Sequence, residues 1–311
     1  MRTALQLSPQ SHYLEAGLAE RLQLVRWFEL DPVQQSTWLE ANAGSVRAVV
    51  TGGHVGCGNA LMSLLPSLRL IAINGVGFDK VDLAFARERG VRVTVTPGAL
   101  TEDVADLAVG LVIALLRGIP GADKYVREGA WLTGETPLAR KVSGRRFGIL
   151  GLGRIGSEIA RRLSVFGPVS YTSPSAKDIP YDFHASVLDL ASAVEVLVVA
   201  CPANAATLGL VNKDVLASLG PEGWLVNVAR GSIVDEAALI AALEAGSLAG
   251  AALDVFEDEP NVPEALRANR KVVLTPHIAS ATIETRKRMA DIVLENLDAV
   301  LAGRAPPAAL V

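Results

Sequence analysis

Short apolar runs of strand length alternate with helical patterns along most of the chain, and this alternation restricts the fold more than any other feature. Strands separated by helices pair in parallel, because a parallel connection needs a crossover. The pattern therefore predicts an α/β fold with two Rossmann-like domains, each a doubly wound parallel sheet, and a cleft between them. The runs form a first series at 47–51, 68–73 and 91–95 and a second series at 146–150, 169–171, 196–199, 224–228, 251–253 and 272–274.

The two ends of the chain are expected to form one domain around an inserted middle. A length of 311 residues suits about two domains. A helix over 283–301 carries an apolar stripe that we expect to pack back on the first series of strands. Residues 1–98 and 282–311 are therefore expected to form one domain and residues 99–281 the other. Small ligands bind in clefts at such junctions.

Two further helices have recognisable ends. Asp79 is expected to cap a helix over 80–89, and Gly90 stands where a left-handed residue can end it. A long amphipathic helix is expected to open at Thr101, followed by two acidic residues that complement the helix dipole.

Composition and charge exclude several classes of protein. Half of the residues are apolar and a fifth are charged, which is typical of a globular chain. The net charge of −4 disfavours nucleic acid and anionic membrane surfaces as partners. No apolar run is long enough to span a bilayer, and the first residues lack the pattern of a secretory signal. Cys57 and Cys201 are expected to be reduced core residues of a cytoplasmic protein, and no metal is expected.

A glycine-rich turn predicts a dinucleotide site. The motif GxGxxG directly follows the strand at 147–150 and precedes an amphipathic helix. In such a turn the first glycine permits the tight bend, the second lets the backbone approach a pyrophosphate, and the third lets the helix pack on the sheet. The alternative is a purely structural turn. The predicted contacts are Gly151, Leu152, Gly153, Arg154, Ile155 and Gly156.

The strand after this turn indicates which dinucleotide is bound. An NAD site usually carries an acidic residue at the end of that strand, where it accepts a hydrogen bond from the ribose 2′-hydroxyl. Here Thr172, Ser173, Ser175 and Lys177 follow the strand, and no carboxylate stands among them. Hydroxyls and an ammonium can hold a 2′-phosphate, so the sequence favours NADP, with NAD as a second acceptable cofactor. The alternative is that these residues form a solvated loop and NAD binds.

Histidine is the first candidate for an acid. His12 and His184 lie in polar segments typical of the surface. His54 follows two glycines in a loop that could line the cleft. His277 differs because it comes just after the strand at 272–274, at the carboxyl edge of a parallel sheet, where open α/β folds place ligands.

Motifs stand in a specific order and spacing at 227–235, 252–260 and 274–280, with further motifs at 74–79, 96–98 and 148–156. Together these segments resemble the D-isomer-specific 2-hydroxyacid dehydrogenases, and the match covers nearly the whole chain. The resemblance implies that the domain built from the chain ends contacts substrate and that the inserted middle holds the nicotinamide nucleotide. It also implies a homodimer in which the region after Thr101 forms much of the contact.

The resemblance assigns a catalytic trio. Arg230 is implied to bind the substrate carboxylate and ketone oxygen, Glu259 to be the partner acid, and His277 to be the proton donor. Reduction of a 2-oxo acid adds a hydride to the carbonyl carbon while charge builds on the oxygen, so an acid and a fixed cation both lower the barrier. A carboxylate beside His277 favours the protonated ring. The alternative is an Arg–Glu pair that stabilises loops beside a core histidine.

Further contacts follow from the resemblance. The backbone amides of Val76 and Gly77 are expected to bind the substrate carboxylate, because a glycine-bounded loop can point amides at an anion. Asp254 is implied to face the nicotinamide carboxamide, although it could instead cap a turn. Trp131 could reach the partner subunit's active site. The other implied substrate contacts are Gly53, Asn74 and Gly75, and the other cofactor contacts are Cys201, Pro202, Thr207, Val228, Ala229 and Ala279.

The resemblance is strongest to NADP-preferring glyoxylate and hydroxypyruvate reductases, with aryl-pyruvate reductases as close relatives. The expected partners are therefore a small 2-oxo acid and the corresponding 2-hydroxy acid. Pro174 stands where many of these enzymes use an arginine on the 2′-phosphate. Two alternatives stay open: a nucleotide-sensing corepressor and a phosphoglycerate-type dehydrogenase.

Overall fold

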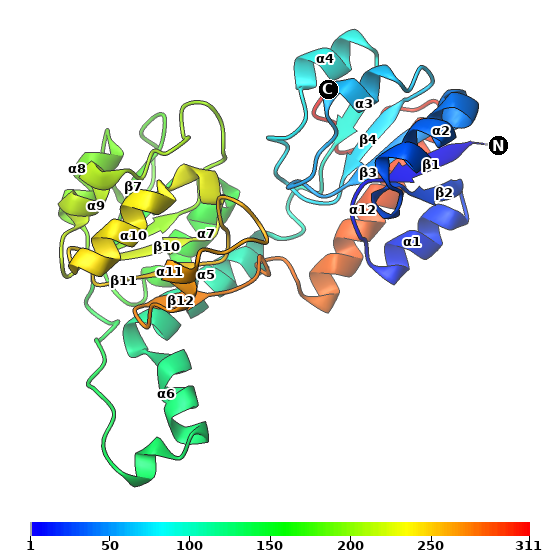
Figure 1. Ribbon diagram of the computed structural model, residues 1–311. Helices are drawn as coiled ribbons and strands as arrows, with labels where there is room; N and C mark the ends of the chain where they lie inside the picture. Colours follow the sequence, from blue (N-terminus) through cyan, green and yellow to red (C-terminus); the bar gives the residue numbers. More distant parts are fainter. Residues whose placement is uncertain (1) are drawn as a thin grey trace. The chain divides into compact units, whose positions relative to one another are not determined.

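The structure is a computed structural model that describes residues 2–311. It divides into two compact units. The first contains the chain up to Leu100 together with Ala281–Val311, and the second contains Thr101–Ser280. Each unit is built on one parallel sheet with helices packed on it, as the alternating pattern predicted (Figure 1).

The first unit has a five-stranded sheet in the order β2-β1-β3-β4-β5, with every neighbouring pair parallel. Strands β1 and β2 were not expected from the sequence. All four residues of β1 are buried, but two of them are polar, which interrupts the apolar run. The elements of this unit are β1 (Thr3–Gln6), α1 (His12–Ala19), β2 (Gln23–Arg26), α2 (Pro32–Asn42), β3 (Val46–Thr51), α3 (Asn59–Ser63), β4 (Leu70–Ile73), α4 (Leu83–Glu88), β5 (Arg92–Thr94) and α12 (Ile283–Leu301), with short 3-10 turns at Trp27–Glu29 and Ala43–Ser45.

Helix α12 completes the first unit, as its apolar stripe predicted. It packs against α1 and β4 (Figure 1). Ala290, Val293 and Leu297 join a buried cluster with residues of these elements, whereas Leu301 is only partly buried. After the helix the chain returns to the sheet, where the Leu310 amide donates a hydrogen bond to the Val93 carbonyl (2.7 Å).

The start of α4 corrects one expectation. The capping residue is Asp82, whose carboxylate accepts a hydrogen bond from the Phe85 amide (3.0 Å), and not Asp79. The residues between them form a turn in which the Val81 amide bonds the Phe78 carbonyl, and Val81 is buried. Because this turn must close before the helix begins, the helix starts three residues later than the acid at 79 suggested.

The second unit has a seven-stranded parallel sheet in the order β12-β11-β10-β9-β6-β7-β8. The chain leaves β6 toward β7 on one side and returns to β9 on the other, so the strand order reverses between β6 and β9. Doubly wound sheets bind ligands at the carboxyl ends of their strands beside such a reversal. The elements are α5 (Thr101–Arg117), α6 (Ile119–Arg127), β6 (Phe147–Leu150), α7 (Arg154–Leu163), β7 (Val169–Thr172), β8 (Asp182–Phe183), α8 (Val187–Ala193), β9 (Val196–Val199), α9 (Lys213–Leu219), β10 (Trp224–Asn227), α10 (Glu236–Ala245), β11 (Gly250–Leu253), α11 (Glu264–Arg267) and β12 (Val272–Leu274), with 3-10 turns at Ala130–Leu132 and Gly231–Ile233.

Helices α5 and α6 differ in how they are packed. The amphipathic α5 packs closely on α7 and buries its apolar stripe. Helix α6 buries none of its residues, and together with the loop after it α6 extends away from the sheet of this unit (Figure 1). Among the described residues no one helix could span a membrane. The pair α5 and α6 meets the criteria of length and composition only when the two are joined across a bend of 62°.

Candidate active site

The glycine-rich turn lies at the strand reversal of the second unit and has the shape that a dinucleotide needs. Gly151 has a φ of +95°, and a Cβ there would lie 2.5 Å from Cys201 Cα. A Cβ on Gly156 would collide with the Gly151 carbonyl oxygen, whereas one on Gly153 would meet nothing within 4 Å. The turn is therefore closed on its protein side and open at the start of α7, where the backbone amides and the helix dipole favour an anion.

The loop after β7 is folded onto this turn. The Lys177 ammonium donates a hydrogen bond to the Leu152 carbonyl oxygen inside the glycine-rich turn (2.6 Å). The buried Tyr171 hydroxyl accepts a hydrogen bond from the Lys177 amide (2.7 Å), and the Ser173 hydroxyl donates to the Ser175 carbonyl (2.6 Å). The loop thus has local order of its own and places a cation against the turn.

The loop after β9 closes the other side of the turn. Cys201 is buried, and this burial raises the pKa of its thiol to about 11, so the sulfur is neutral at physiological pH. Thr207 folds the loop on itself, because its hydroxyl donates to the Pro202 carbonyl and accepts from the Asn204 amide (both 2.8 Å). These contacts shape the loop, and the predicted role of Cys201, Pro202 and Thr207 toward a cofactor stays a prediction.

Asn227, at the end of β10, shapes the turn that carries Arg230. Its side-chain oxygen accepts a hydrogen bond from the Ala229 amide (3.0 Å), and its side-chain nitrogen donates to the Arg230 carbonyl (2.9 Å). Arg230 Nη1 donates to the Ala229 carbonyl (2.8 Å). Asn227 is buried, and so is the neighbouring Val228. The side chain of Asn227 therefore fixes the conformation of this turn.

Asp254, at the end of β11, fixes the backbone around His277. Its side chain is fully buried. One carboxylate oxygen accepts hydrogen bonds from the Thr275 hydroxyl (2.6 Å) and the Ile278 amide (2.9 Å), and the other accepts from the Ala279 amide (3.0 Å). The Asp254 carbonyl accepts from the His277 amide (2.8 Å). These bonds match the alternative in which Asp254 caps a turn, and its contact with a cofactor stays a prediction.

His277 occupies a strained backbone conformation. Its φ is +54°, and it is the only residue other than glycine with a positive φ in the part of the chain that the structure describes. Such a conformation costs roughly 1–3 kcal/mol and is kept only where the surroundings impose it. The hydrogen bonds of Asp254 on both sides of His277 supply that constraint.

The side chains of Glu259 and His277 meet across two neighbouring loops. His277 Nδ1 lies 2.7 Å from one Glu259 carboxylate oxygen. The other oxygen accepts a hydrogen bond from the Phe256 amide (3.0 Å), which orients the carboxylate. About a third of the His277 side chain and a fifth of the Glu259 side chain are exposed. The pair is thus partly desolvated and reachable by a small ligand, and the structure brings these two predicted residues together.

Gly231 brings the turn of Arg230 against the loop of Glu259. A Cβ on Gly231 would collide with the backbone of Phe256 and Glu257. The two loops therefore meet backbone to backbone, which only glycine permits at this position. Arg230, Glu259 and His277 follow β10, β11 and β12, three neighbouring strands, so all three lie at one edge of the sheet.

The predicted substrate loop lies in the first unit, at the carboxyl ends of β3 and β4. The Asn74 amide donates a hydrogen bond to the Thr51 carbonyl (2.8 Å), and the Gly75 carbonyl accepts from the Thr96 amide (2.8 Å). Val76 and Gly77 follow as partly exposed residues, and Gly53 is buried in the adjacent loop. The loop is thus anchored at its base while its glycine-bounded end faces the surface of this unit. Its contact with a substrate stays a prediction.

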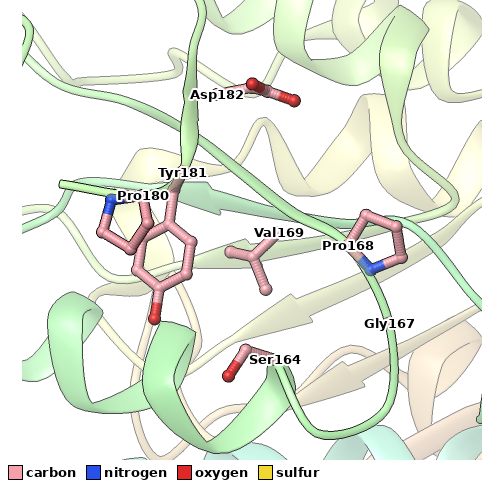
Figure 2. A pocket seen from close by; sticks show the side chains of 7 residues that line it. All are labelled: Ser164, Gly167, Pro168, Val169, Pro180, Tyr181 and Asp182. Carbon is pink, nitrogen blue, oxygen red and sulfur yellow. The ribbon is translucent and has the colours of Figure 1, made fainter.

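A separate cavity lies at the opposite edge of the second sheet. It has a volume of about 350 Å³ and sits at the amino ends of β7 and β8, beside the end of α7 (Figure 2). Because the glycine-rich turn follows the carboxyl end of β6, this cavity is not part of the dinucleotide site. Its lining consists of Ser164, Gly167, Pro168, Val169, Pro180, Tyr181 and Asp182.

Comparison with known proteins agrees with this geometry. The family model of the D-isomer specific 2-hydroxyacid dehydrogenase, NAD binding domain, matches residues 109–279, the span that contains the glycine-rich turn and the trio. The chain belongs to the D-isomer-specific 2-hydroxyacid dehydrogenase family. The resemblance inferred from the motifs is thereby confirmed, and so is the fold class. The family uses nicotinamide dinucleotides, and the shape of the glycine-rich turn fits one.

Individual relatives are similar over almost their whole length. Hydroxyphenylpyruvate reductase of Plectranthus scutellarioides is 49% identical over 302 residues, which is 96% of both chains. A glyoxylate/hydroxypyruvate reductase of Arabidopsis thaliana is 48% identical over 302 residues, which is again 96% of both chains. The solved structure of an NADPH-dependent glyoxylate/hydroxypyruvate reductase of Sinorhizobium meliloti, in complex with NADP and malonate, has a TM-score of 0.92 and 39% identity, and the match covers 100% of this chain and 97% of that chain.

Sequence reasoning assigned no role to two residues that organise the dehydrogenase site. Asn227 and Gly231 stand in the segment that carried the family resemblance, but their contacts with Arg230 and Phe256 are visible only in the fold. The signal that could have found Gly231 is its position directly after the candidate arginine, in a turn that must lie close to another loop.

We expect the substitution Gly231→Ala to separate the loops of Arg230 and Glu259, because a methyl group has no space beside Phe256. A displacement of about 1 Å at a reacting group can cost about 100-fold in rate, so we expect kcat/KM for 2-oxo acid reduction to fall by at least that factor. Steady-state kinetics on protein shown to be folded by circular dichroism measures the effect. Gly44→Ala is the control, because a Cβ there meets nothing within 4 Å. Equal kinetics for the two variants would contradict the argument.

Proposed function

We propose that this protein reduces small 2-oxo acids, such as glyoxylate and hydroxypyruvate, to D-2-hydroxy acids, with NADPH as the preferred reductant and NADH as a second. The observation that carries the proposal is the 2.7 Å pair between Glu259 and His277 at the carboxyl edge of the sheet that bears the glycine-rich turn. The reductase names of the similar proteins support the same reaction class. In this proposal the first unit, residues 1–98 with 282–311, binds substrate, and residues 99–281 bind the nucleotide.

The proposed roles follow from the charges that the reaction develops. The reduced nicotinamide, when bound, supplies the hydride that adds to the carbonyl carbon of the substrate. His277 faces Glu259 through Nδ1, so Nε2 is the ring nitrogen that gives its proton to the carbonyl oxygen. The Glu259 carboxylate holds the ring through its Nδ1 atom. Arg230 holds the substrate carboxylate and stabilises the negative charge that grows on the oxygen.

The remaining contacts divide between the two ligands. The backbone amides of Val76 and Gly77, in the loop that Asn74 and Gly75 begin, bind the substrate carboxylate, with Gly53 beside them. For the nucleotide, the open start of α7 takes the pyrophosphate and the loop after β7 takes the 2′-phosphate. Lys177 supports this second assignment, because its ammonium is already fixed against the glycine-rich turn. The other proposed nucleotide contacts are Cys201, Pro202, Thr207, Val228, Ala229, Asp254 and Ala279.

The proton-donor role of His277 is tested by His277→Ala. Loss of a positioned general acid costs typically 100- to 10,000-fold in rate, and we expect kcat with NADPH and glyoxylate or hydroxypyruvate to fall by a factor in this range. The decrease in reduced-nicotinamide absorbance measures turnover, and the dissociation constant of NADPH is expected to stay within about twofold, because the proposed proton transfer makes no contribution to nucleotide binding. His12→Ala is the control, since His12 is exposed in α1.

Equal turnover by the wild type and the His277 variant would contradict the acid assignment. NADPH binding by the wild type without turnover of any 2-oxo acid would favour the nucleotide-sensing corepressor over the enzyme. A panel of 2-oxo acids of increasing side-chain size, run with both reduced nucleotides, then identifies the preferred substrate.

The cofactor preference is tested by Thr172→Asp, which places a carboxylate at the end of β7. The new charge repels a 2′-phosphate and can accept a hydrogen bond from a ribose 2′-hydroxyl. We expect the ratio of kcat/KM for NADPH to that for NADH to fall by at least about tenfold, which corresponds to about 1.4 kcal/mol. Thr172→Asn is the matched control, because it has the same size as the aspartate without its charge. An unchanged ratio in the aspartate variant would contradict the assigned 2′-phosphate site.

We further propose that the protein is a homodimer held by α6 and the loop after it. This region exposes large apolar side chains together, and exposed apolar groups of this kind mark interaction surfaces. They include Leu132, which is 92% exposed, and Leu138, which is 100% exposed. A second copy of the chain is the proposed occupant, and Trp131 of this region could then reach the partner's active site. The other exposed apolar residues here are Ile119 and Val126.

The double substitution Leu132→Asp with Leu138→Asp is expected to convert the dimer to a monomer, because two charges would be buried without partners. Light scattering after gel filtration measures the mass in solution. Leu208→Asp is the control, since Leu208 is 70% exposed in the loop after β9. A monomeric wild type, or a variant that stays dimeric, would contradict the proposal.

The cytoplasm is the proposed compartment. The support is that both cysteines are free and buried, as in proteins of reducing compartments. The proposed partners are small 2-oxo and 2-hydroxy acids, and neither nucleic acid nor a membrane is proposed, in keeping with the acidic net charge.

A further inference from the structure

The first unit contains a cluster of buried polar side chains at one edge of its sheet. Gln6, Ser8, Thr51, Asn74 and Thr96 are each at most 8% exposed, and all stand at or just after the carboxyl ends of β1, β3, β4 and β5. Polar groups are unfavourable in a core unless hydrogen bonds compensate their burial. Together they form a polar strip at this edge, and the proposed substrate loop rises from the same edge.

Ser8 connects the N-terminal segment to the loop that contains Gly53. Its hydroxyl oxygen accepts a hydrogen bond from the Gly52 amide (2.9 Å). The space around Gly52 is limited, because a Cβ on this residue would lie 3.4 Å from the Ser8 hydroxyl and 2.8 Å from the His54 ring. Ser8 also accepts from the Gln10 side-chain amide at 3.0 Å. The loop that contains Gly52 and Gly53 is thus hydrogen-bonded to the N-terminal segment, 44 positions away in the sequence.

Gln10 continues this connection to the loop that carries Val76 and Gly77. Its side-chain oxygen accepts a hydrogen bond from the Asn74 side-chain nitrogen (2.8 Å), across 64 positions of sequence. The Asn74 side-chain oxygen is buried and has no hydrogen-bond partner among the described residues. Gln10 is therefore the contact that orients the Asn74 amide. Without it, both ends of a buried amide would lack partners, and the loop would have to move to solvate them.

We propose that Ser8 and Gln10 are positioning residues for the recognition of the substrate carboxylate. They hold Gly52 and Asn74 on one framework, so that the backbone amides of Val76 and Gly77 keep a fixed orientation toward an anion. This inference rests on the proposed function, since it assumes that these amides bind the carboxylate of a 2-oxo acid. Neither side chain is assigned a contact with the reacting atoms.

The test is steady-state kinetics of Gln10→Ala and Ser8→Ala in the full-length protein. We expect KM for both glyoxylate and hydroxypyruvate to rise by about tenfold, because both substrates present the same carboxylate, which corresponds to about 1.4 kcal/mol of binding. The value of kcat is expected to stay within about threefold, because the proton donor and the hydride path are unchanged. The dissociation constant of NADPH is expected to stay at the wild-type value.

Gln35→Ala is the matched control. Its side-chain amide donates to the Trp27 (3.2 Å) and Leu30 (3.0 Å) carbonyls in the same unit, and neither of these bonds reaches the substrate loop. We expect its KM values to match the wild type even if its thermal stability falls as much as that of Gln10→Ala. Gln10→Met, which keeps the volume but cannot bond Asn74, serves if the alanine variant does not fold, and it is expected to show the same rise in KM.

A double-mutant cycle separates positioning through Asn74 from a general loss of packing. If Gln10 acts through Asn74, the combination of Gln10→Ala with Asn74→Ala raises KM no more than Asn74→Ala alone. Fully additive effects, or an equal rise in KM in the Gln35 control, would overturn the inference, as would wild-type KM values in a folded Gln10 variant. Absence of 2-oxo acid reduction in the wild type would instead refute the proposed function.

Discussion

The candidate active site depends on the buried carboxylate of Asp254, which is not proposed to contact the substrate. Asp254 accepts hydrogen bonds from three groups in the segment after β12, and its own carbonyl accepts one from His277. These bonds hold His277 in a left-handed conformation that the residue would not adopt alone. The ring is thereby turned to meet Glu259. The proposed proton donor is consequently positioned by Asp254, at the end of the neighbouring strand, rather than by its own backbone preference.

Close backbone contacts at glycines fix the positions of the other loops of the site. Gly151 lies against Cys201, Gly156 against the carbonyl of Gly151, and Gly231 against the loop after β11. The contacts of Gly151 and Gly231 join segments that follow different strands of one parallel sheet, and the contact of Gly156 closes the turn after β6. Because the carboxyl ends of parallel strands meet at one edge, a few glycines suffice to bring nucleotide turn, cation and acid into adjacent loops. The parallel sheet thus brings the loops to one edge, and the glycines allow the backbones of these loops to lie in close contact.

The sequence predicted the elements whose pattern is local. Six strands of the second unit, the helix α5 and the extent of α12 follow from apolar periodicity, whereas β8 and α6 were not predicted. The glycine-rich turn follows from its flanking strand and helix. Strand β1 was missed because two of its buried residues are polar, and one of them, Gln6, belongs to the buried polar edge of the first unit. The start of α4 was misplaced because Asp79 and Asp82 offer the same cap, and only the packing of Val81 decides between them.

The contacts of the site were harder to predict than the strands and helices, because they join positions that are far apart in the sequence. The trio came from a family resemblance, since nothing in the spacing of Glu259 and His277, 18 positions apart, shows that they touch. The links from Gln10 to Asn74 and from Gly231 to Phe256 join positions that no local rule relates. Such contacts depend on the tertiary arrangement, and their residue types are common in ordinary turns.

The path of the chain through the two units also constrains how the protein is made. The second unit is one continuous segment, whereas the first needs α12 and the hydrogen bond from Leu310 to Val93, both contributed by residues that are synthesised after the whole second unit. During synthesis the strands of the first unit must therefore wait, with the apolar sheet face that α12 covers still exposed, until the second unit has been made. The nucleotide-binding half can fold earlier, because all of its residues precede α12 in the chain.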